Sequence, residues 1–200
     1  IKYPCMFSHD TEAAAFTEIW RRKHTDFLYL TINTTIGGAL VIDGKLHNGA
    51  GRISGTLEHM CLYPDGKPCY CGRQGCVEAY CSMGALLKDA RVATLNEFFS
   101  KIEDGNAGFL QIWHNFLRNL AMAINNSIHL IDCDVVLGGL ISLFLTDDDI
   151  ELLQQYICEI NSFSFYKPRI YLGIIAENVS AIGAAYHLIW DFLDHDKIFR

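Results

Sequence analysis

One stretch constrains the fold of this chain more than any other, running from His59 to Glu78 as HMCLYPDGKPCYCGRQGCVE. Its glycines allow the tight turns that bring Cys69, Cys71 and Cys76 to one point. One imidazole and three thiolates form a tetrahedral ligand set for structural Zn²⁺, which leaves no open position for catalysis by the metal. The alternative is free or disulfide-bonded cysteines, but a CxC pair does not easily bridge to itself. The sequence therefore predicts a closed zinc site with the ligands His59, Cys69, Cys71 and Cys76.

The overall composition limits the possible functions. Two hundred residues, half of them apolar, can bury a sizeable core as one domain or as part of one. The formal net charge of −7 argues against nucleic-acid binding by this segment alone, because phosphate contacts need a basic face. The chain has no apolar run of about 18 residues, so we expect no contact with a membrane.

The cysteines outside the cluster are scattered and stand among apolar neighbours in the sequence. This placement predicts small core residues rather than a disulfide framework, for Cys5, Cys61, Cys81, Cys133 and Cys158. No secretory signal precedes them. We therefore expect a reducing compartment, and hence a cytoplasmic protein.

Strands and helices alternate along the chain, which is typical of an α/β fold. Apolar runs predict strands at 27–32, 39–42, 135–137 and 169–172, and residues 1–10 suggest the end of another strand. Helical periodicity predicts helices at 11–22, 82–89, 94–102, 109–130, 147–160 and 179–193. Asp43-Gly44 predicts a hairpin turn, and Thr146 to Asp149 predict a helix cap.

The His59–Glu78 stretch and its surroundings resemble the ROK family, which is named for repressors, open reading frames and kinases. That family carries a pattern close to GEIGHM…PDG…CxCGxxGCLE with zinc on its histidine and cysteines, and the match extends from about Phe7 to Tyr186. The resemblance implies the actin-like, hexokinase-type (ribonuclease H-like) ATPase fold, and a homodimer or higher homo-oligomer. We expect residues 1–200 to be the C-terminal part of a ROK domain with a zinc loop at 59–78. The family's N-terminal DxGGT motif and any DNA-binding domain are missing from this sequence.

The resemblance also implies a catalytic or sugar-binding role for Asp10. In ROK kinases an Asn-Asp pair opens a helix, and the aspartate takes the proton from the sugar hydroxyl that attacks ATP. In this sequence the pair is His9-Asp10. Taken without the resemblance, Asp10 is better explained as a helix N-cap. His9 favours a regulator, because family regulators tolerate histidine at this position.

Further sugar contacts are implied at the cysteine-rich stretch. His59 and Glu78 match the histidine of GEIGH and the glutamate of CLE, whereas Thr56 replaces the glutamate of GEIGH. Thr56 weakens this acceptor, because a hydroxyl offers one short neutral partner where a carboxylate accepts two hydrogen bonds. Glu58 replaces a glycine and is out of register with the expected acid.

The implied nucleotide site departs from the family pattern. The family's phosphate loop GTGIGGG reads NTTIGGA here, so Asn33 and Thr35 replace glycines that let backbone N–H groups approach phosphate. The stretch LGGLIS still matches the adenosine side, although it could equally be a strand end that needs glycines. The candidate nucleotide contacts are Thr34, Thr35, Gly138 and Gly139.

Three functions remain open from the sequence. The first is the sugar-sensing part of a ROK transcriptional regulator of the NagC/XylR type, which binds DNA through a domain outside this chain. The second is an ATP- and Mg²⁺-dependent sugar kinase, for a hexose or N-acetylmannosamine, with Asp10 as the general base. The third is a remnant that only dimerises. The substitutions in the implied site favour the regulator, and we expect no phosphorylation by these 200 residues alone.

Overall fold

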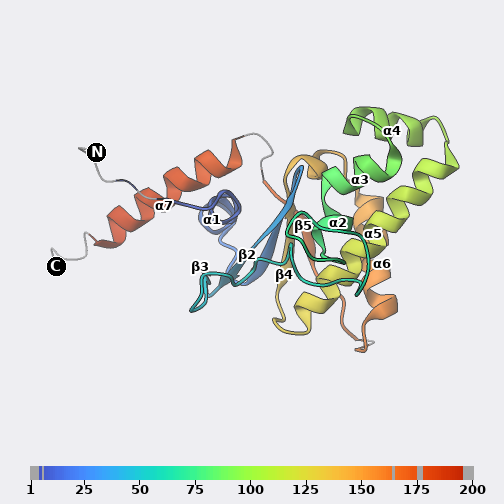
Figure 1. Cartoon of the computed structure of the whole chain (residues 1–200). Helices are drawn as coiled ribbons and strands as arrows, with labels where there is room; N and C mark the ends of the chain where they lie inside the picture. The colour runs from blue at the N-terminus through green and yellow to red at the C-terminus, as the bar shows by residue number, and fades with distance from the viewer. Residues whose placement is uncertain (1–4, 6, 164, 175–177, 196–200) are drawn as a thin grey trace.

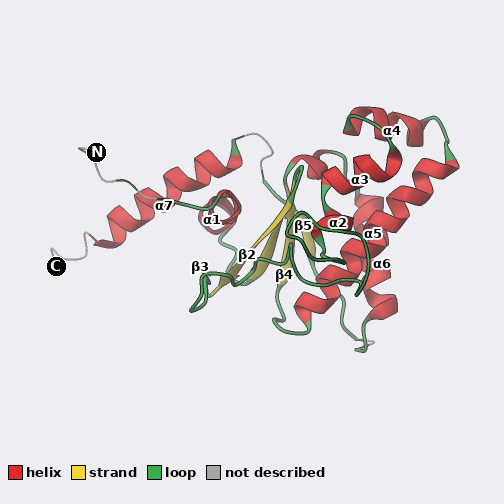
Figure 2. Cartoon of the chain, viewed as in Figure 1, coloured by secondary structure: helices red, strands yellow, loops and turns green. Residues whose placement is uncertain are grey.

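The computed structural model describes residues 5, 7–163, 165–174 and 178–195. Its centre is one mixed sheet with the strand order β3-β2-β1-β4-β5. Helices cover both faces of this sheet (Figures 1 and 2), which confirms the α/β class. The strands are β1 (Phe27–Ile32), β2 (Ile36–Ile42), β3 (Lys45–Leu46), β4 (Asp134–Gly138) and β5 (Ile170–Leu172).

The predicted helices are all present, with their ends shifted by a few residues. The described helices are α1 (Asp10–Arg22), α2 (Glu78–Cys81), α3 (Met83–Ala90), α4 (Leu95–Glu103), α5 (Ala107–Ile128), α6 (Asp147–Ile160) and α7 (Val179–His195). The sequence did not indicate α2, β3 or the short 3-10 helix η1 (Leu140–Leu143). The strand end expected within residues 1–10 falls largely outside the described residues. No described helix is long and apolar enough to cross a membrane.

The central strand β1 explains the mixed sheet. All six of its residues are buried, as expected for a strand that is covered on both faces. It pairs antiparallel with β2 on one side and parallel with β4 on the other. Asp43 and Gly44 join β2 to β3 with positive φ angles of 52° and 69°, the conformation that a two-residue hairpin turn requires.

The larger core lies between the sheet and α5. Leu30 of β1 and Leu137 of β4 are fully buried there, together with Leu117, Leu120 and Ile124 of α5. Each such side chain contributes about 1.5–3 kcal/mol by leaving water. The spacing of the three α5 residues along one helix face is the apolar periodicity from which the sequence predicts this helix.

The opposite face of the sheet is covered by α1, and α7 packs on α1 in turn (Figure 1). Ala13 of α1 is almost fully buried. A Cβ atom at Gly183 of α7 would lie 1.6 Å from the Ala13 carbonyl oxygen, so the two helix backbones are in direct contact. Trp20 stacks on Tyr186 beside this contact, with ring centroids 5.3 Å apart.

A buried carboxylate fastens the end of α1 to β5. Glu18 Oε1 accepts a hydrogen bond from the Ile174 N–H (2.8 Å), and Arg22 Nη1 donates to the Leu172 carbonyl (2.8 Å). Burial raises the pKa of Glu18, while the Ile174 N–H and the Arg22 charge oppose this rise. The pair therefore fixes the position of α1 along the sheet.

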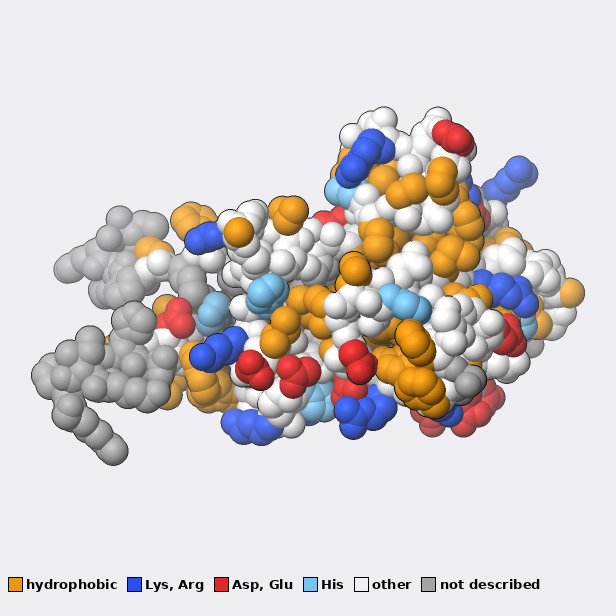
Figure 3. All heavy atoms as spheres, turned by 90° about the horizontal axis from the view of Figure 1, so that it is seen from below, with side chains coloured by type: hydrophobic (Ala, Val, Ile, Leu, Met, Phe, Trp, Pro, Cys, Tyr) orange, Lys and Arg blue, Asp and Glu red, His pale blue; other side chains and the backbone are white. Residues whose placement is uncertain are grey.

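The lower face of the molecule exposes apolar side chains around the α5–β4 connection. Leu130 is 83% exposed and Phe165 is 86% exposed. Figure 3 views the molecule from below and shows hydrophobic side chains gathered in the middle of this face. An apolar pocket opens beside Leu130, between β1 and the end of α5, and is lined by Leu28, Leu57 and Met60 among others.

The cysteine predictions are partly wrong. Cys81 and Cys133 are buried as expected, whereas Cys5, Cys61 and Cys158 are exposed. Apolar neighbours in the sequence did not imply burial, because adjacent residues of a helix or loop point in different directions.

We expect Gly183→Ala to lower the free energy of unfolding by about 1–3 kcal/mol, because the added methyl overlaps the Ala13 carbonyl. Helix propensity alone would raise the free energy of unfolding instead, by up to about 1 kcal/mol. Chemical denaturation measures the difference. Gly108→Ala, in the exposed first turn of α5, is the control and should be neutral or stabilising. Equal effects of the two substitutions would contradict the proposed packing.

Candidate functional site

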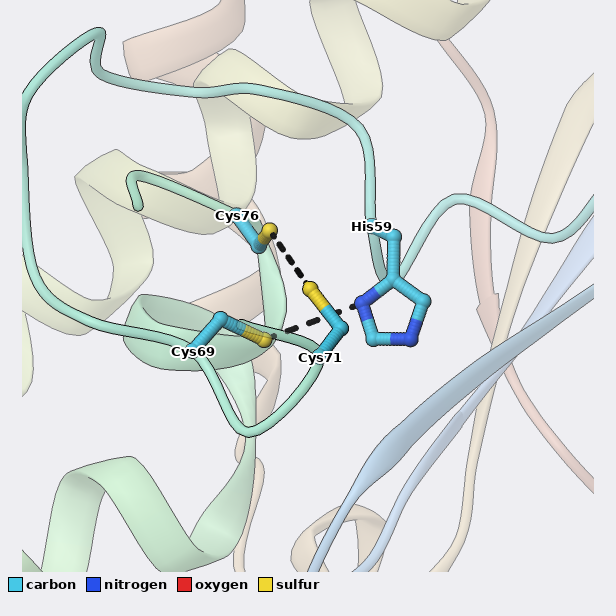
Figure 4. A group of neighbouring side chains, drawn as sticks. All are labelled: His59, Cys69, Cys71 and Cys76. Carbon is cyan, nitrogen blue, oxygen red and sulfur yellow. Dashed lines mark hydrogen bonds between the residues drawn. The ribbon is translucent and has the colours of Figure 1, made fainter. Parts of the chain in front are cut away.

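Four side chains of the His59–Glu78 stretch converge just before α2 (Figure 4). Their donor atoms, one ring nitrogen and three sulfurs, all lie within 4.8 Å of one another. Cys69 Sγ lies 3.7 Å from His59 Nδ1, and Cys71 Sγ lies 3.7 Å from Cys76 Sγ. A tetrahedral Zn²⁺ with Zn–S bonds of about 2.3 Å places its sulfurs about 3.8 Å apart. The donor spacing therefore fits the predicted ion.

Backbone hydrogen bonds and glycines hold this loop in shape. The Cys69 N–H donates to the Arg73 carbonyl (2.8 Å), and the Gly72 N–H donates to the Cys69 carbonyl (3.0 Å). Gly75 has a φ of 76°, and a Cβ atom there would lie 1.6 Å from the Tyr63 carbonyl oxygen. Glycine is required at this position both for the left-handed backbone and for the close approach.

The thiols of the cluster differ in their electrostatic surroundings. The backbone N–H of Arg73 lowers the pKa of Cys71 to about 6, against the effect of burial, and the Arg73 side chain assists. Burial raises the pKa of Cys76 to about 12, and the neighbouring thiols add to this rise. A divalent cation would stabilise all of these groups as thiolates, because only deprotonated sulfur ligates a metal.

The two ring nitrogens of His59 point in different directions. Its Nδ1 points toward the cysteines, whereas its Nε2 points away from them (Figure 4). The ring lies at a steep angle to the Tyr70 ring, with centroids 5.2 Å apart. A metal on Nδ1 would leave the proton on Nε2, which makes that atom a hydrogen-bond donor. The imidazole can therefore connect the cysteine cluster to a ligand beyond it.

Glu78 joins the cysteine-rich loop to the sheet. Its Oε2 accepts a hydrogen bond from the Ile36 N–H at the start of β2 (2.9 Å), and its own N–H donates to the Glu58 carbonyl (2.9 Å). Burial raises the pKa of Glu78, while the Ile36 N–H and the His59 charge oppose the rise. Glu78 also lines a pocket between the loop and α3, together with Lys67 and Ser82.

Asp10 lies at the same end of β2. A Cβ atom at Gly37 would lie 2.6 Å from Thr11 Oγ1, so the first turn of α1 contacts β2 one residue after Ile36. Asp10 Oδ1 accepts a hydrogen bond from the Thr11 N–H (2.8 Å) and lies 3.2 Å from His9 Nδ1. The N-cap prediction for Asp10 is wrong: His9 occupies that position, and Asp10 is the first helical residue. A carboxylate is still favourable there because of the helix dipole.

Thr56 borders a different pocket from Glu78. Its hydroxyl donates to the Ile53 carbonyl of its own loop. Its neighbours belong to the apolar pocket of the lower face. The structure therefore brings His9 and Asp10, His59 and Glu78 to one end of the sheet, and leaves Thr56 outside that group.

The two turns of the expected nucleotide site, after β1 and after β4, lie side by side. Asn33 Oδ1 accepts a hydrogen bond from the Leu140 N–H (2.7 Å), and a Cβ atom at Gly139 would lie 2.8 Å from the same oxygen. Thr34 and Thr35 are exposed at the tip of the turn. Asn33 therefore occupies a backbone N–H that an anion could otherwise bind.

Sequence reasoning missed the environment of Glu58. Its Oε2 is buried and has no hydrogen-bond partner among the described residues. The available signal was the replacement of a glycine by an acid directly before His59. The bridging role of Asn33 was also missed, because the sequence does not show that the turns after β1 and β4 are adjacent.

Comparison with known proteins identifies kinases and a regulator with this architecture. N-acetylmannosamine kinase from Escherichia coli O1:K1 / APEC is 32% identical over 163 residues, which are 78% of this chain and 55% of that protein. The chain thus spans about half the length of the curated relatives it matches. A second match, from Escherichia coli O127:H6, carries the same name at the same identity.

Solved structures agree on the fold. ROK hexokinase from Thermus thermophilus superposes with a TM-score of 0.85 at 26% identity, covering 96% of this chain and 67% of that one. A ROK family transcriptional regulator, a homologue of the E. coli MLC protein, gives 0.76 at 22% identity, covering 88% of this chain and 50% of that one. The family model described as the ROK family matches residues 1–187, and on this evidence the chain belongs to the ROK family.

Proposed function

We propose that this chain is the sugar-binding lobe of a ROK sugar kinase that acts on a hexose or an N-acetylhexosamine. The observation that carries the proposal is the convergence at the start of β2. The Ile36 N–H holds Glu78, and the next residue, Gly37, contacts the helix turn that presents Asp10. Two adjacent residues of β2 thereby position two carboxylates: one holds Glu78, the proposed sugar-binding group, and the other contacts the helix turn of Asp10, the proposed general base.

The chemistry requires little from the protein beyond position and charge. As the sugar oxygen attacks the terminal phosphorus of ATP, its proton passes to a carboxylate oxygen of Asp10. A new P–O bond forms, the bond to the ADP oxygen breaks, and ADP leaves with the electron pair. Asp10 is 70% exposed in its side chain, so a substrate hydroxyl can reach it. Mg²⁺ supplies charge that offsets the phosphates in such reactions.

The cysteine cluster has a supporting role in this proposal. Zn²⁺ on His59, Cys69, Cys71 and Cys76 would fix the loop that carries Glu78 and would orient the His59 ring. His59 Nε2–H would then donate to a sugar hydroxyl. The N-acetylmannosamine kinases at 32% identity support an N-acetylhexosamine as the substrate class.

Asn33 favours a second candidate, the sugar-sensing part of a ROK transcriptional regulator. Its side chain binds the Leu140 N–H, and Thr35 adds a β-branched side chain to the same turn. Both features reduce the space and the donors available to a phosphate. A regulator needs the sugar site but not phosphoryl transfer.

We expect the purified protein to contain one zinc per chain and Cys69→Ser to lose both zinc and solubility, because the loop has few apolar contacts of its own. Elemental analysis and thermal denaturation measure the two effects. Cys61→Ser is the control, since this exposed thiol lies in the same loop outside the cluster. Less than half an equivalent of zinc in the unmodified protein would contradict the site.

In the full-length protein that carries this chain, we expect Asp10→Asn to reduce ATP-dependent phosphorylation of N-acetylmannosamine by roughly 10²- to 10⁴-fold. Sugar binding should change much less, because Asp10 acts mainly on the transferred proton. A coupled assay for ADP and calorimetry separate the two effects. Glu12→Gln, which changes an acidic residue two positions after Asp10 in α1, is the control. Sugar binding without any turnover in the unmodified protein would favour the regulator.

Asn33→Gly should strengthen ADP binding to the full-length protein by roughly 10- to 100-fold, the equivalent of one hydrogen bond to a charged group. The substitution frees the Leu140 N–H and removes a side chain from the turn. Asn33→Ala is the matched variant, because it frees the same N–H but retains a Cβ atom. Calorimetry that detects no nucleotide in any of the three proteins would contradict the kinase proposal.

A further inference from the structure

A short antiparallel pairing inside the cysteine-rich loop places Cys61 opposite Cys76. Two backbone hydrogen bonds flank the pair, from the Leu62 N–H to the Gly75 carbonyl (2.7 Å) and from the Val77 N–H to the Met60 carbonyl (2.9 Å). Cys61 and Cys76 are therefore a non-hydrogen-bonded pair, in which Cα atoms lie about 4.5 Å apart and side chains project to the same side. A disulfide joins residues whose Cα atoms are about 4.4–6.8 Å apart. The backbone register thus suits a disulfide between these two cysteines.

The backbone next to Cys76 is held from two directions. The Gly75 N–H donates to the Lys67 carbonyl (2.8 Å), so the residue before Cys76 is bonded to two other segments of the loop. A Cβ atom at Gly75 would lie 1.6 Å from the Tyr63 carbonyl oxygen, so the paired segments are in direct contact. The register of Cys61 against Cys76 is therefore fixed by backbone contacts and not by the thiols themselves.

The two thiols differ in their access to solvent and in their expected role. Cys61 is exposed and lies outside the group of four candidate metal ligands, whereas Cys76 is buried and belongs to that group. Metal ligation engages the electron pair of a thiolate, so a bound ion would leave Cys61 as the reactive thiol of this loop. Redox-sensor cysteines are solvent-accessible and often stand next to a second, resolving cysteine. Cys61 and Cys76 have this arrangement.

We propose that Cys61 is a redox modification site, and that its disulfide with Cys76 removes one ligand from the cysteine cluster. The oxidant is a peroxide. The Cys61 thiolate attacks one peroxide oxygen, the O–O bond breaks, and hydroxide leaves with the electron pair, which gives a sulfenic acid on Cys61. The Cys76 thiolate then attacks the Cys61 sulfur, the S–O bond breaks, and a second hydroxide leaves as the disulfide forms. Each sulfur loses one electron, and the peroxide accepts both.

The disulfide changes the metal-binding capacity of the loop. Only His59, Cys69 and Cys71 then remain for a Zn²⁺ ion that requires four protein ligands in a closed site. Thiol exchange would reopen the disulfide in the reducing compartment that the sequence leads us to expect. The pairing needs only the backbone register and the two thiols, and therefore does not rest on the proposed sugar-binding function.

The experiment treats the zinc-loaded, full-length protein with a small excess of hydrogen peroxide, alongside Cys61→Ser and the control Cys158→Ser. A chromogenic chelator follows zinc release, and mass spectrometry of non-reduced peptides maps the disulfides. We expect the unmodified protein to lose its zinc and to form the Cys61–Cys76 disulfide, and dithiothreitol with added Zn²⁺ should restore the metal. Cys158→Ser should behave in the same way, because that exposed thiol lies in α6, outside the loop. Cys61→Ser should retain its zinc over the same time.

The inference is overturned if Cys61→Ser releases zinc as fast as the unmodified protein, because Cys61 is then not the reactive thiol. A mapped disulfide between Cys71 and Cys76, whose sulfurs lie 3.7 Å apart, would likewise overturn it, because the cluster then oxidises within itself. If the protein binds no zinc, the proposed metal site fails, but the peptide map still tests the pairing. A map of the peroxide-treated protein without the Cys61–Cys76 disulfide contradicts the inference in either case.

Discussion

The hydrogen bond from the Ile36 N–H to the Glu78 carboxylate joins the two parts of this molecule that carry its chemistry. Ile36 begins β2, the strand beside the central strand β1, and Glu78 lies two residues after Cys76 of the cysteine cluster. Bonds between a backbone N–H and a charged carboxylate are short and strong, and this one is buried. The sheet thereby determines where the cysteine-rich loop lies, although that loop contains little regular structure of its own.

The fold follows from the sequence wherever local patterns are strong. The apolar run of β1, the Asp43-Gly44 turn and the long face of α5 each specify one element without help from distant residues. The sequence did not indicate α2, because four helical residues after a tight loop have no periodicity to detect. Nor did it show that Cys61 is exposed, since that depends on how the loop is folded by contacts such as Gly75 with Tyr63.

The cluster of His59 with three cysteines could be predicted from the sequence, but the geometry around it could not. Spacing and residue type were sufficient to propose His59 and the cysteines, because a metal requires a small set of donors. The positions of Thr56 and Glu58 depend instead on which way the loop before His59 faces the sheet. Thr56 and Glu58 are only two residues apart, yet Thr56 lines the pocket on the lower face whereas the Glu58 charge acts on Glu78. Alignment with a motif cannot supply that difference.

The direct contact between Gly183 and Ala13 has a mechanical consequence for the first turn of α1. Packed interiors transmit displacement, because no empty space absorbs it. Arg22 ties α1 to the last residue of β5, and Glu18 ties it to Ile174 just after that strand; α7 follows later in the chain. A displacement of α7 would therefore act on α1 at Ala13, against the Glu18 and Arg22 contacts that hold α1 on the sheet. Asp10 begins that helix, so the position of the proposed general base would depend on contacts made from the C-terminal side of the chain.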